Sequence, residues 1–391
     1  MVTNQRPYER THPWLTFAFD LGRLQHTDWL ALGGAAAMID RIAGAPLDPD
    51  VAEEVHRLYL ARGALATTAI EGNTLSEAEA RDVIDDRATL PPSRAYLGRE
   101  IRNIVEACNM VAGEIAGQGR FPLDVAGVER LNAMVLQGLE VEDHVAPGKV
   151  RDVNVSVGGY RCPDRRDAGF LLARLCEVLN GFPLPEENRY AFSILKAVFA
   201  HLYFVWIHPF GDGNGRTARL IELAILLEAG LPQPACHLPS NHYNLTRTEY
   251  YRQLARASGQ EDGIYGFASY AIRGFADGLR EQVEVIREHQ EAVAWTNFVH
   301  GQFGEGGGAT ERRRRSLVLA LSRQPEVVPV NRLPSLDATV ARDYATVSNR
   351  TLLRDVEALV RRGLLSSGPD GVRANRERIR AFLPWRNEPP S

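Results

Sequence analysis

The feature that most constrains this chain is the stretch from Asn188 to Trp206, which is apolar at almost every position and leads directly into a glycine-rich loop. A helix with apolar side chains on nearly all of its faces must be buried on most sides. No apolar run reaches the ~18–20 residues that a membrane span requires. The stretch therefore predicts the central helix of a folded core, in a chain whose 391 residues allow two or three domains.

The rest of the sequence predicts more helices and very little sheet. Apolar residues recur at helical spacing between positions 20 and 115, and one of these helices is expected to end at the Glu-Gly-Asn turn at 71–73. Residues 148–160 instead alternate β-branched side chains and contain a Gly-Gly pair, which predicts a short strand or hairpin. We therefore expect a mainly α fold with one short β-hairpin in its main domain.

The glycine-rich loop, HPFGDGNGRTAR at residues 208–219, has the features of an anion-binding site. Gly213 and Gly215 can adopt positive φ and let backbone N–H groups converge, and the helix that follows directs its positive end to the same place. Arg216 and Arg219 are three residues apart at that helix start, where each cation costs a few tenths to ~1 kcal/mol against the helix dipole. A bound polyanion would offset this cost.

Two other side chains of the loop suit phosphate chemistry. Asp212 supplies a hard oxygen ligand beside the phosphate cradle, so it is the expected ligand of a magnesium ion whose other ligands are phosphate oxygens and water. His208 has the only side chain in the loop with an ordinary pKa near neutrality, which makes it the candidate general base. Taken singly, a GxG pattern and a buried histidine are more often structural than functional.

Other nucleotide and metal motifs are missing from the sequence. It contains no GxxxxGK[ST] P-loop, and the glycine-rich loop follows a helix rather than a strand and does not match GxGxxG. The pairs His201/His208 and His237/His242 lack convincing metal spacing. The four cysteines form no CxxC pair and the N-terminus lacks the apolar core of a signal peptide, so we expect neither a disulfide framework nor a zinc site, and a cytoplasmic location.

The loop resembles the signature of the Fic family, His-x-Phe-x-Asp/Glu-Gly-Asn-Gly-Arg-x-x-Arg, and every defined position matches. The buried helix before it, the segment GKVRDVNVSVGGY and the segment RTEYYRQL at 247–254 also resemble the family, so the resemblance spans roughly residues 20–290. It implies a Fic-type helical core with a β-hairpin flap. It also implies an enzyme that transfers AMP from ATP to a Tyr, Thr or Ser hydroxyl of a target protein, with release of pyrophosphate.

The same resemblance implies roles for single residues. His208 would deprotonate the incoming hydroxyl and Asp212 would hold Mg²⁺, while Arg216 and Arg219 would bind the β- and γ-phosphates. Tyr251 resembles a residue near the adenine, and Ser258 replaces an Asn seen there in some relatives. The complete set implied to bind ATP is Gly211, Gly213, Asn214, Gly215, Arg216, Arg219 and Tyr251.

The flap implied by the resemblance lies at Val155, Ser156 and Val157, where the target backbone would add as an extra strand and present its hydroxyl. From the residues alone, a plain edge hairpin fits this segment equally well.

A second segment, TTAIEGNTL at 67–75, resembles the inhibitory motif of the family through Thr67, Glu71 and Gly72. Glu71 is predicted at a helix C-terminus, where negative charge is disfavoured, just as positive charge is disfavoured at the helix start that carries Arg219. We therefore expect Glu71 to pair with Arg219 and to occupy the place of the γ-phosphate; the alternative is a surface glutamate. In some relatives this glutamate positions a water molecule for AMP removal, so the resemblance also allows the reverse activity.

The C-terminal part of the chain differs from the rest in charge. Residues 310–391 carry a net charge of +7, and the remainder carries −11. Three helices followed by a short hairpin are predicted there, an order that resembles a winged helix-turn-helix with Ser348 to Arg362 as its recognition helix. A packing or partner-binding wing is an equally good interpretation.

If this part binds DNA, Arg350 and Arg354 are the candidate contacts on the recognition helix. The run from Arg312 to Arg315 would add phosphate contacts. Asp355 and Glu357 lie on the same helix and are expected to dilute its positive face.

The sequence thus predicts an adenylyltransferase for protein hydroxyls that uses ATP and Mg²⁺, is held inactive through Glu71 and does not cross a membrane. The alternative is a DNA-binding transcriptional regulator whose Fic-like core senses nucleotide without turnover. A homodimer is implied by the family resemblance only. The expected parts are an N-terminal helical region with the inhibitory motif (1–115), a Fic catalytic core (116–290), a linker (291–309) and a winged helix-turn-helix-like domain (310–391).

Overall fold

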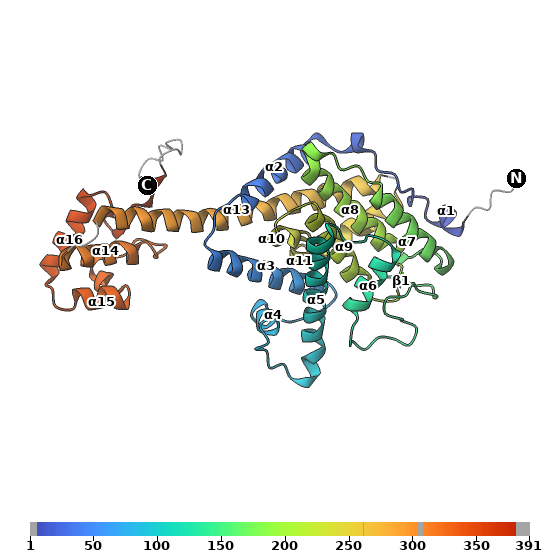
Figure 1. Ribbon diagram of the computed structural model, residues 1–391, viewed down its shortest axis with the longest axis horizontal. Coiled ribbons are helices and arrows are strands. Elements are labelled where there is room, and N and C mark those ends of the chain that lie inside the picture. Colours follow the sequence, from blue (N-terminus) through green and yellow to red (C-terminus); the bar gives the residue numbers. More distant parts are fainter. Residues whose placement is uncertain (1–5, 261, 304–307, 381–391) are drawn as a thin grey trace. The chain divides into compact units, whose positions relative to one another are not determined.

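Helix α8, Arg189–Ile207, is the central helix of the first of two units in the chain. The computed structural model describes residues 6–260, 262–303 and 308–380, and the chain divides into the units Met1–Glu284 and Val285–Ser391 (Figure 1). α8 is buried at nearly every position, as its apolar sequence predicts. Among the described residues, Glu186–Ile207 is long and apolar enough to cross a membrane, although the sequence predicted no such segment. Of its most apolar stretch, 83% is buried inside the protein.

The first unit is built from helices that surround α8 and the next helix, α9, Asn214–Glu228. α2 and α7 pack against α8, and α5 and α6 pack against α9, so that all of them share one hydrophobic core. The other helices that begin in this unit are α1 (Pro7–Thr11), α2 (His26–Ala43), α3 (Pro49–Ala69), α4 (Glu77–Ile84), α5 (Ala95–Gln118), α6 (Val125–Val135), α7 (Arg165–Asn180), α10 (Gln233–Cys236), α11 (Leu238–Leu245), α12 (Arg247–Ala257) and α13 (Gly263–Phe303), with 3₁₀ turns at Leu21–Arg23, Pro92–Arg94 and Glu186–Asn188.

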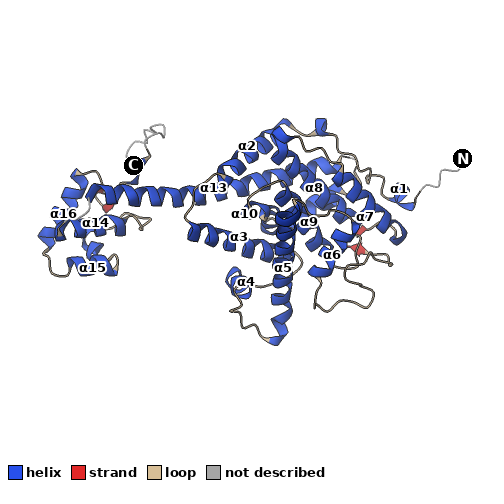
Figure 2. Ribbon diagram, viewed as in Figure 1, coloured by secondary structure: helices blue, strands red, loops and turns tan. Residues whose placement is uncertain are grey.

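Strands contribute little to the described part of the chain, which contains two short antiparallel hairpins (Figure 2). The hairpin of the first unit joins β1, Ser156–Val157, to β2, Tyr160–Arg161, through the predicted Gly-Gly turn. Just upstream, Val150 forms an isolated β-bridge with Phe210 of the glycine-rich loop. The predicted mainly α fold with a short hairpin is therefore confirmed, and the hairpin segment is joined to the loop.

The second unit has the predicted order of three helices followed by a hairpin. The helices are α14 (Ala309–Leu321), α15 (Ala338–Tyr344) and α16 (Asn349–Arg361), with 3₁₀ turns at Val330–Ser335 and Arg376–Ile379, and the hairpin joins β3 (Leu365–Gly368) to β4 (Gly371–Ala374). Ser348 caps α16, since its side chain accepts a hydrogen bond from the backbone N–H of Thr351. The unit has a hydrophobic core of its own.

The linker predicted at 291–309 is largely helical. Residues 291–303 belong to α13, where Trp295, Val299 and Phe303 follow each other at intervals of four and are buried in the core of the second unit. The glycines downstream suggested a flexible segment, but this apolar spacing keeps the chain helical as far as Phe303. Residues 304–307 of the predicted linker lie outside the described residues.

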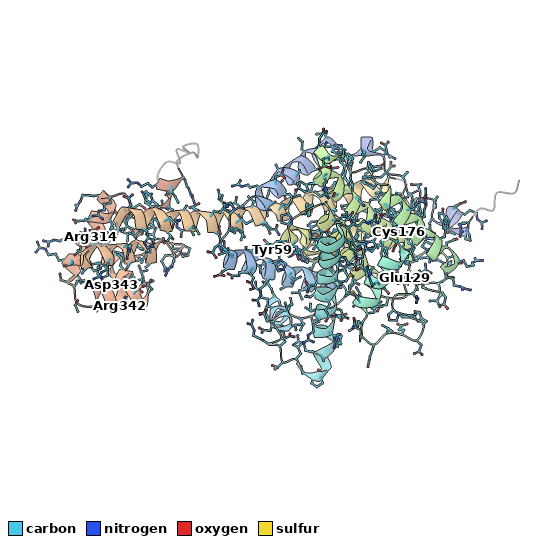
Figure 3. The ribbon with its side chains drawn as sticks, viewed as in Figure 1. Tyr59, Glu129, Cys176, Arg314, Arg342 and Asp343 are labelled. Carbon is cyan, nitrogen blue, oxygen red and sulfur yellow. The ribbon has the colours of Figure 1, made fainter. Side chains whose placement is uncertain are left out.

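Asp355 does not dilute the positive face of α16, contrary to the prediction. Its side chain is buried and accepts hydrogen bonds from Nε of Arg313 at 2.8 Å and from Nε of Arg314 at 2.7 Å, both on α14. The hydroxyl of Tyr344 donates a further bond at 3.2 Å. Two arginines of the predicted phosphate-binding run therefore serve a buried carboxylate; Figure 3 labels Arg314 within this unit.

Candidate active site

The glycine-rich loop begins where α8 ends, at a residue with unusual backbone geometry. His208 is the C-cap of α8 and has φ 49° and ψ 60°, in the left-handed region that few non-glycine residues adopt. Its carbonyl oxygen accepts a hydrogen bond of 2.7 Å from Nε of the buried Arg151. Arg151 also donates to the carbonyls of Val153 and Pro163, so it ties the hairpin segment to the start of the loop.

The middle of the loop is closed by side-chain amides. Asn214 accepts a hydrogen bond from the N–H of Phe210 and donates one to its carbonyl, each at 2.9 Å. Asn132 of α6 donates to the carbonyl of Asp212 at 2.9 Å. Gly213 has φ 74° and precedes the first residue of α9, so the loop turns directly into a helix N-terminus, as the sequence predicts.

His208 has the proton arrangement of a general base. Its Nδ1 atom lies 3.3 Å from the carbonyl oxygen of Val205, which can only accept, so Nδ1 carries the proton and Nε2 keeps its lone pair. Burial lowers the pKa of His208 to about 4, and the backbone bond to Val205 and the nearby Glu71 and Asp212 carboxylates only partly oppose this effect. The ring is therefore neutral at physiological pH.

Arg219 is buried and bonded to α3 and to the turn that follows it. Its Nη2 atom donates to Oε1 of Glu71 at 2.6 Å and to the carbonyl oxygen of Thr67 at 2.8 Å. The arginine side chain is only 1% exposed, whereas that of Glu71 is 34% exposed. The Nε and Nη1 atoms of Arg219 have no hydrogen-bond partner within the described residues, so the buried guanidinium has unused donors.

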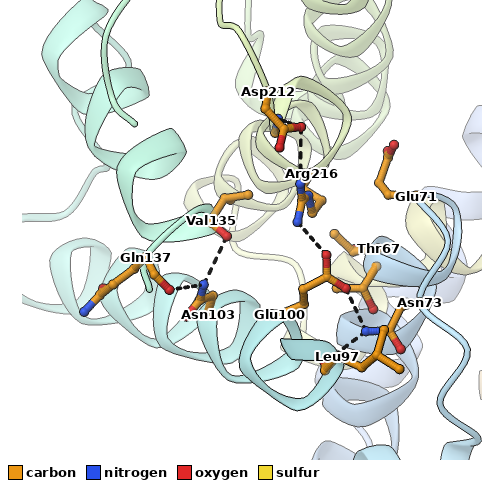
Figure 4. A network of polar contacts seen from close by, with 12 residues as sticks. Thr67, Glu71, Asn73, Leu97, Glu100, Asn103, Val135, Gln137, Asp212 and Arg216 are labelled. Atoms are coloured by element: carbon orange, nitrogen blue, oxygen red, sulfur yellow. Dashed lines mark hydrogen bonds and ion pairs between the residues drawn. The ribbon is translucent and has the colours of Figure 1, made fainter. Parts of the chain in front are cut away.

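Arg216 is bound to a different carboxylate. Its Nη1 atom donates to Oε1 of Glu100, on α5, at 2.9 Å, and its Nη2 atom lies 3.5 Å from Oδ1 of Asp212 (Figure 4). Glu100 is in turn bonded by the side-chain amide of Asn73, two residues beyond Glu71. Both arginines of the loop thus have carboxylate partners from helices or turns far away in the sequence.

The pKa values of the two carboxylates around these arginines shift in opposite directions. Burial would raise the pKa of Glu71, but the charge of Arg219 and its hydrogen bond outweigh burial, so the pKa of Glu71 is lowered. For Glu100 burial prevails over the charge of Arg216, and Asp212 and Glu71 add to it, so the pKa of Glu100 is raised. The cluster holds three acidic side chains against two guanidinium groups, which is a reason for one carboxylate to resist ionisation.

The side chains of Glu71 and His208 face one cavity of about 800 Å³. Tyr251 lies on its wall and donates a hydrogen bond of 3.1 Å to the carbonyl of Ile70. Ser258 also lines it and accepts a bond from Nε1 of Trp206. The complete lining is Trp14, Glu71, Val157, Gly158, Gly159, Tyr160, Val205, Trp206, His208, Gly215, Tyr250, Tyr251, Leu254, Ala255, Ser258 and Gly259.

Gly215 lies at a close approach at the edge of this cavity. A Cβ atom at this position would overlap the carboxylate of Glu71 and would lie 3.2 Å from Nη1 of Arg219. Gly72, in the turn that carries Glu71, has φ 111°, which disfavours any other residue. Glycines on both sides therefore allow the turn and the helix start to meet.

Residues 122–226 match the Fic/DOC family. The chain contains a Fic domain. Over 229 residues it is 30% identical to protein adenylyltransferase fic-1 of Caenorhabditis briggsae, covering 58% of this chain and 39% of that protein. It is also 30% identical over 258 residues to protein adenylyltransferase Fic of Culex quinquefasciatus, covering 62% and 47%. The chain thus spans less than half the length of these curated relatives.

Solved structures agree with the fold of the Fic domain. A Fic family protein from Desulfovibrio desulfuricans G20 matches with a TM-score of 0.56 and 20% identity, covering 95% of this chain and 98% of that one. Fic-1 of Caenorhabditis elegans, residues 134–508, matches with a TM-score of 0.52 and 22% identity, covering 67% and 73%. At these identities the likeness concerns the fold alone.

The structure brings most of the predicted site residues of the Fic domain together. Gly213, Asn214, Gly215, Arg216 and Arg219 form the end of the loop and the first turns of α9. The side chain of Asn214 closes the loop, so its backbone N–H is the group left for a ligand. Gly211 packs against Val145. Of the residues predicted to bind ATP, Gly215 and Tyr251 line the cavity, whereas Gly211, Gly213, Asn214, Arg216 and Arg219 do not.

Sequence reasoning missed three polar residues that hold the Fic site together. They are Arg151, Asn132 and Glu100, all of which bond to the loop or to Arg216. Arg151 carried a usable signal, since an arginine in an alternating β-branched segment needs a partner if it is buried. Asn132 and Glu100 lie on ordinary amphipathic helices, where nothing in the spacing separates them from surface residues.

Proposed function

We propose that this protein transfers AMP from ATP to a Tyr, Thr or Ser hydroxyl of a target protein. The observation that carries the proposal is that a neutral base, His208, and the start of α9 at Gly215 line one cavity with Glu71, whose carboxylate bonds the buried, partly unsatisfied guanidinium of Arg219. The similarity to proteins named protein adenylyltransferase supports the same reaction class.

In this reaction Nε2 of His208 takes the proton of the target hydroxyl. The freed oxygen attacks the α-phosphorus of ATP, the bond between the α-phosphorus and the bridging oxygen breaks, and pyrophosphate leaves with the electron pair. The base needs its lone pair, and the bond from Nδ1 to Val205 leaves Nε2 available. Transfer of this kind depends mainly on positioning and on neutralising the charge of the phosphates.

The phosphates would be held by the start of α9. The backbone N–H groups of Gly213, Asn214 and Gly215 lie at the helix N-terminus, where anions are favoured. Arg216 would bind the β-phosphate and Arg219 the γ-phosphate once Glu71 has left it. Tyr251 is at the cavity wall where the base of the nucleotide would lie.

A Mg²⁺ ion fits Asp212 only when phosphate supplies other ligands. The Asp212 side chain is 50% exposed, and no group of three or more Asp, Glu, His or Cys residues within the described part of the chain could hold a metal ion by itself. Asp212 with phosphate oxygens and water would complete the coordination that Mg²⁺ prefers. The ion would neutralise phosphate charge beside the loop.

Glu71 is proposed to hold the enzyme inactive. Its carboxylate bonds the guanidinium that would bind the γ-phosphate, and it lies against the backbone of Gly215 at the start of α9. ATP can therefore bind productively only when the turn at 71–73 moves or when Glu71 is replaced. The same carboxylate lies at the cavity that contains His208, so removal of AMP from a modified target, with Glu71 orienting water, is proposed as a second activity.

The test of the proposal is labelling with radioactive ATP and a host lysate. Glu71→Gly should label protein strongly and the wild type weakly, and Glu71→Gly combined with His208→Ala should not label. Mass spectrometry of the labelled band should show AMP on a hydroxyl. Equal labelling by wild type and Glu71→Gly would contradict autoinhibition, and labelling without His208 would contradict the assignment of the base. AMP removal is tested by adding the enzyme to the AMP-modified target, and release of AMP should require both Glu71 and His208.

The hairpin beside the cavity is proposed to receive the target. β1 is exposed at both residues, and Val157 is 43% exposed and lines the cavity with the Gly-Gly turn. An extended segment of the target that adds to β1 would bring its hydroxyl toward His208.

A cytoplasmic location and a homodimer remain proposals from the sequence.

We propose a second function, binding of duplex DNA, for the unit Val285–Ser391. Residues 345–348 separate α15 from α16, which is the turn length of a helix-turn-helix. Arg350 and Arg354 are exposed on α16 and make no ion pair or hydrogen bond within the described residues. On α15 of the same unit, Arg342 forms an ion pair with Asp343 at 3.7 Å (Figure 3), so its charge is less free than those of Arg350 and Arg354.

A fluorescent DNA duplex tests this second function. The wild type should bind with an affinity that falls steeply with salt, and Arg350→Glu with Arg354→Glu should abolish binding. The control variant is Arg280→Glu, on the exposed part of α13 in the first unit, which changes the charge but should retain binding. Absence of binding at low salt would leave the alternative of a partner-binding module.

A further inference from the structure

Arg216 and Arg219 are each bonded by a carboxylate from a distant segment of the chain. Glu71 bonds Arg219, and Glu100 of α5 bonds Arg216. Glu100 uses its two oxygens for two partners: Oε1 accepts from Nη1 of Arg216 and Oε2 accepts from Nδ2 of Asn73, each at 2.9 Å. Figure 4 shows the resulting chain of contacts from Asp212 through Arg216 and Glu100 to Asn73.

Asn73 is itself firmly held. Its side chain is buried, with Nδ2 also donating to the carbonyl of Leu97 at 3.0 Å and Oδ1 accepting from the N–H of Leu75 at 3.0 Å. Its backbone N–H donates to the carbonyl of Thr68. All donors and acceptors that orient this amide are therefore engaged, and the amide can fix the direction of the Glu100 carboxylate.

The two contacts of Arg216 differ in strength. The bond to Glu100 is 2.9 Å long, whereas the approach to Asp212 is 3.5 Å, at the outer limit of a hydrogen bond. A ligand oxygen would replace the weaker contact first and leave the guanidinium attached to Glu100. A buried cation also requires an anion in every state of the protein, and Arg216 is 6% exposed.

We propose that Glu100 is a positioning residue for nucleotide binding: it holds the guanidinium of Arg216 where the β-phosphate binds, and Asn73 orients it. This inference rests on the proposed function, in which Arg216 is the β-phosphate ligand. It follows that the turn at 71–73 acts in two opposite ways. Glu71 competes with the nucleotide at Arg219, while Asn73, two residues later, supports nucleotide binding through Glu100 and Arg216.

Nucleotide affinity measured by titration calorimetry tests the proposal, with Glu71→Gly as the parent in the full chain. Glu100→Ala and Asn73→Ala should each weaken ATP and ADP binding about tenfold. Glu100→Gln, which keeps an acceptor but not the charge, should lose less. AMP lacks the β-phosphate, so its affinity should stay at the parent value in every variant. Glu106→Gln, at an exposed position on α5, is the matched control and should match the parent.

The AMP measurement separates positioning from general damage to the fold. A variant in which AMP binding weakens as much as ATP binding would overturn the proposal. Tighter ATP binding by Glu100→Ala would also overturn it, because Glu100 would then be a competitor of phosphate. If Glu100→Ala does not fold, Asn73→Ala and Glu100→Gln decide the question by the same comparison. Failure of the parent to label protein would contradict the proposed function but leaves the affinity comparison readable.

Discussion

Arg219 Nη2 and Glu71 Oε1 lie 2.6 Å apart, although 148 positions separate the two residues in the chain. The pair joins the start of α9, where an isolated positive charge is disfavoured, to the turn that follows α3, where an isolated negative charge is disfavoured. Each charge therefore relieves the other, and the pair keeps a buried guanidinium neutralised while no phosphate is bound. Nucleotide binding and the native contact then compete for the same donors.

Replacement of Glu71 should lower stability and increase stabilisation by ATP. Glu71→Gln keeps an acceptor for Arg219 but removes the negative charge that compensates this buried guanidinium, which should cost about 1–3 kcal/mol of unfolding free energy. Because ATP binds only the folded protein, saturating ATP should restore more unfolding free energy than the substitution removes. Thermal melts with and without ATP check it, with Glu54→Gln on the exposed side of α3 as control. A shift by ATP that is no larger in Glu71→Gln than in the wild type would contradict competition at Arg219.

The pH profile of labelling should be flat across the neutral range. Burial lowers the pKa of His208 to about 4, so the neutral, active base is fully present above about pH 5 and is lost as the pH falls through 4. The Glu71 carboxylate raises the pKa of His208, so its loss in Glu71→Gly should move the acid limb of the pH profile to a still lower pH. kcat/KM reports the free enzyme, so its acid limb is the measurement. A limb near pH 6.5, the ordinary value for histidine, would show that burial does not control this group.

Much of the first unit follows from local patterns in the sequence. The apolar run that becomes α8 predicts a buried helix, and GDGNG followed by two arginines predicts the loop and the helix start of α9. The Gly-Gly pair predicts the turn between β1 and β2. These features depend on neighbours in the chain, which periodicity and turn chemistry describe well.

Contacts between distant segments were predictable only where two charges were each unfavourable on their own. That argument paired Glu71 with Arg219, and the two are bonded. Glu100 gave no such signal, because a glutamate on an amphipathic helix is compatible with solvent. Asp355 was expected on the surface for the same reason, and only the arginines of α14 that pack against it explain its burial.

A backbone change at β1 should separate target binding from nucleotide binding. The N–H of Cys162 bonds the carbonyl of Val155, so the next pair, Ser156 opposite Arg161, has its backbone groups turned away from β2. Ser156→Pro in Glu71→Gly removes an outward donor, and it should reduce target labelling at least about tenfold with unchanged ATP affinity. Ser156→Ala keeps the backbone and should label normally. Equal labelling by both variants would exclude strand addition at β1.

Asp355 should be the most sensitive polar position of the second unit. It is 1% exposed and compensates two largely buried guanidinium groups, on Arg313 and Arg314, so Asp355→Ala should cost about 3–5 kcal/mol and loosen α14 and α16. Glu357→Ala on the same helix removes an exposed carboxylate 3.9 Å from Arg361 and should cost less than about 0.5 kcal/mol. Hydrogen exchange of the two helices in the full chain measures the difference. Similar protection in both variants would mean that the buried carboxylate is not what joins α14 to α16.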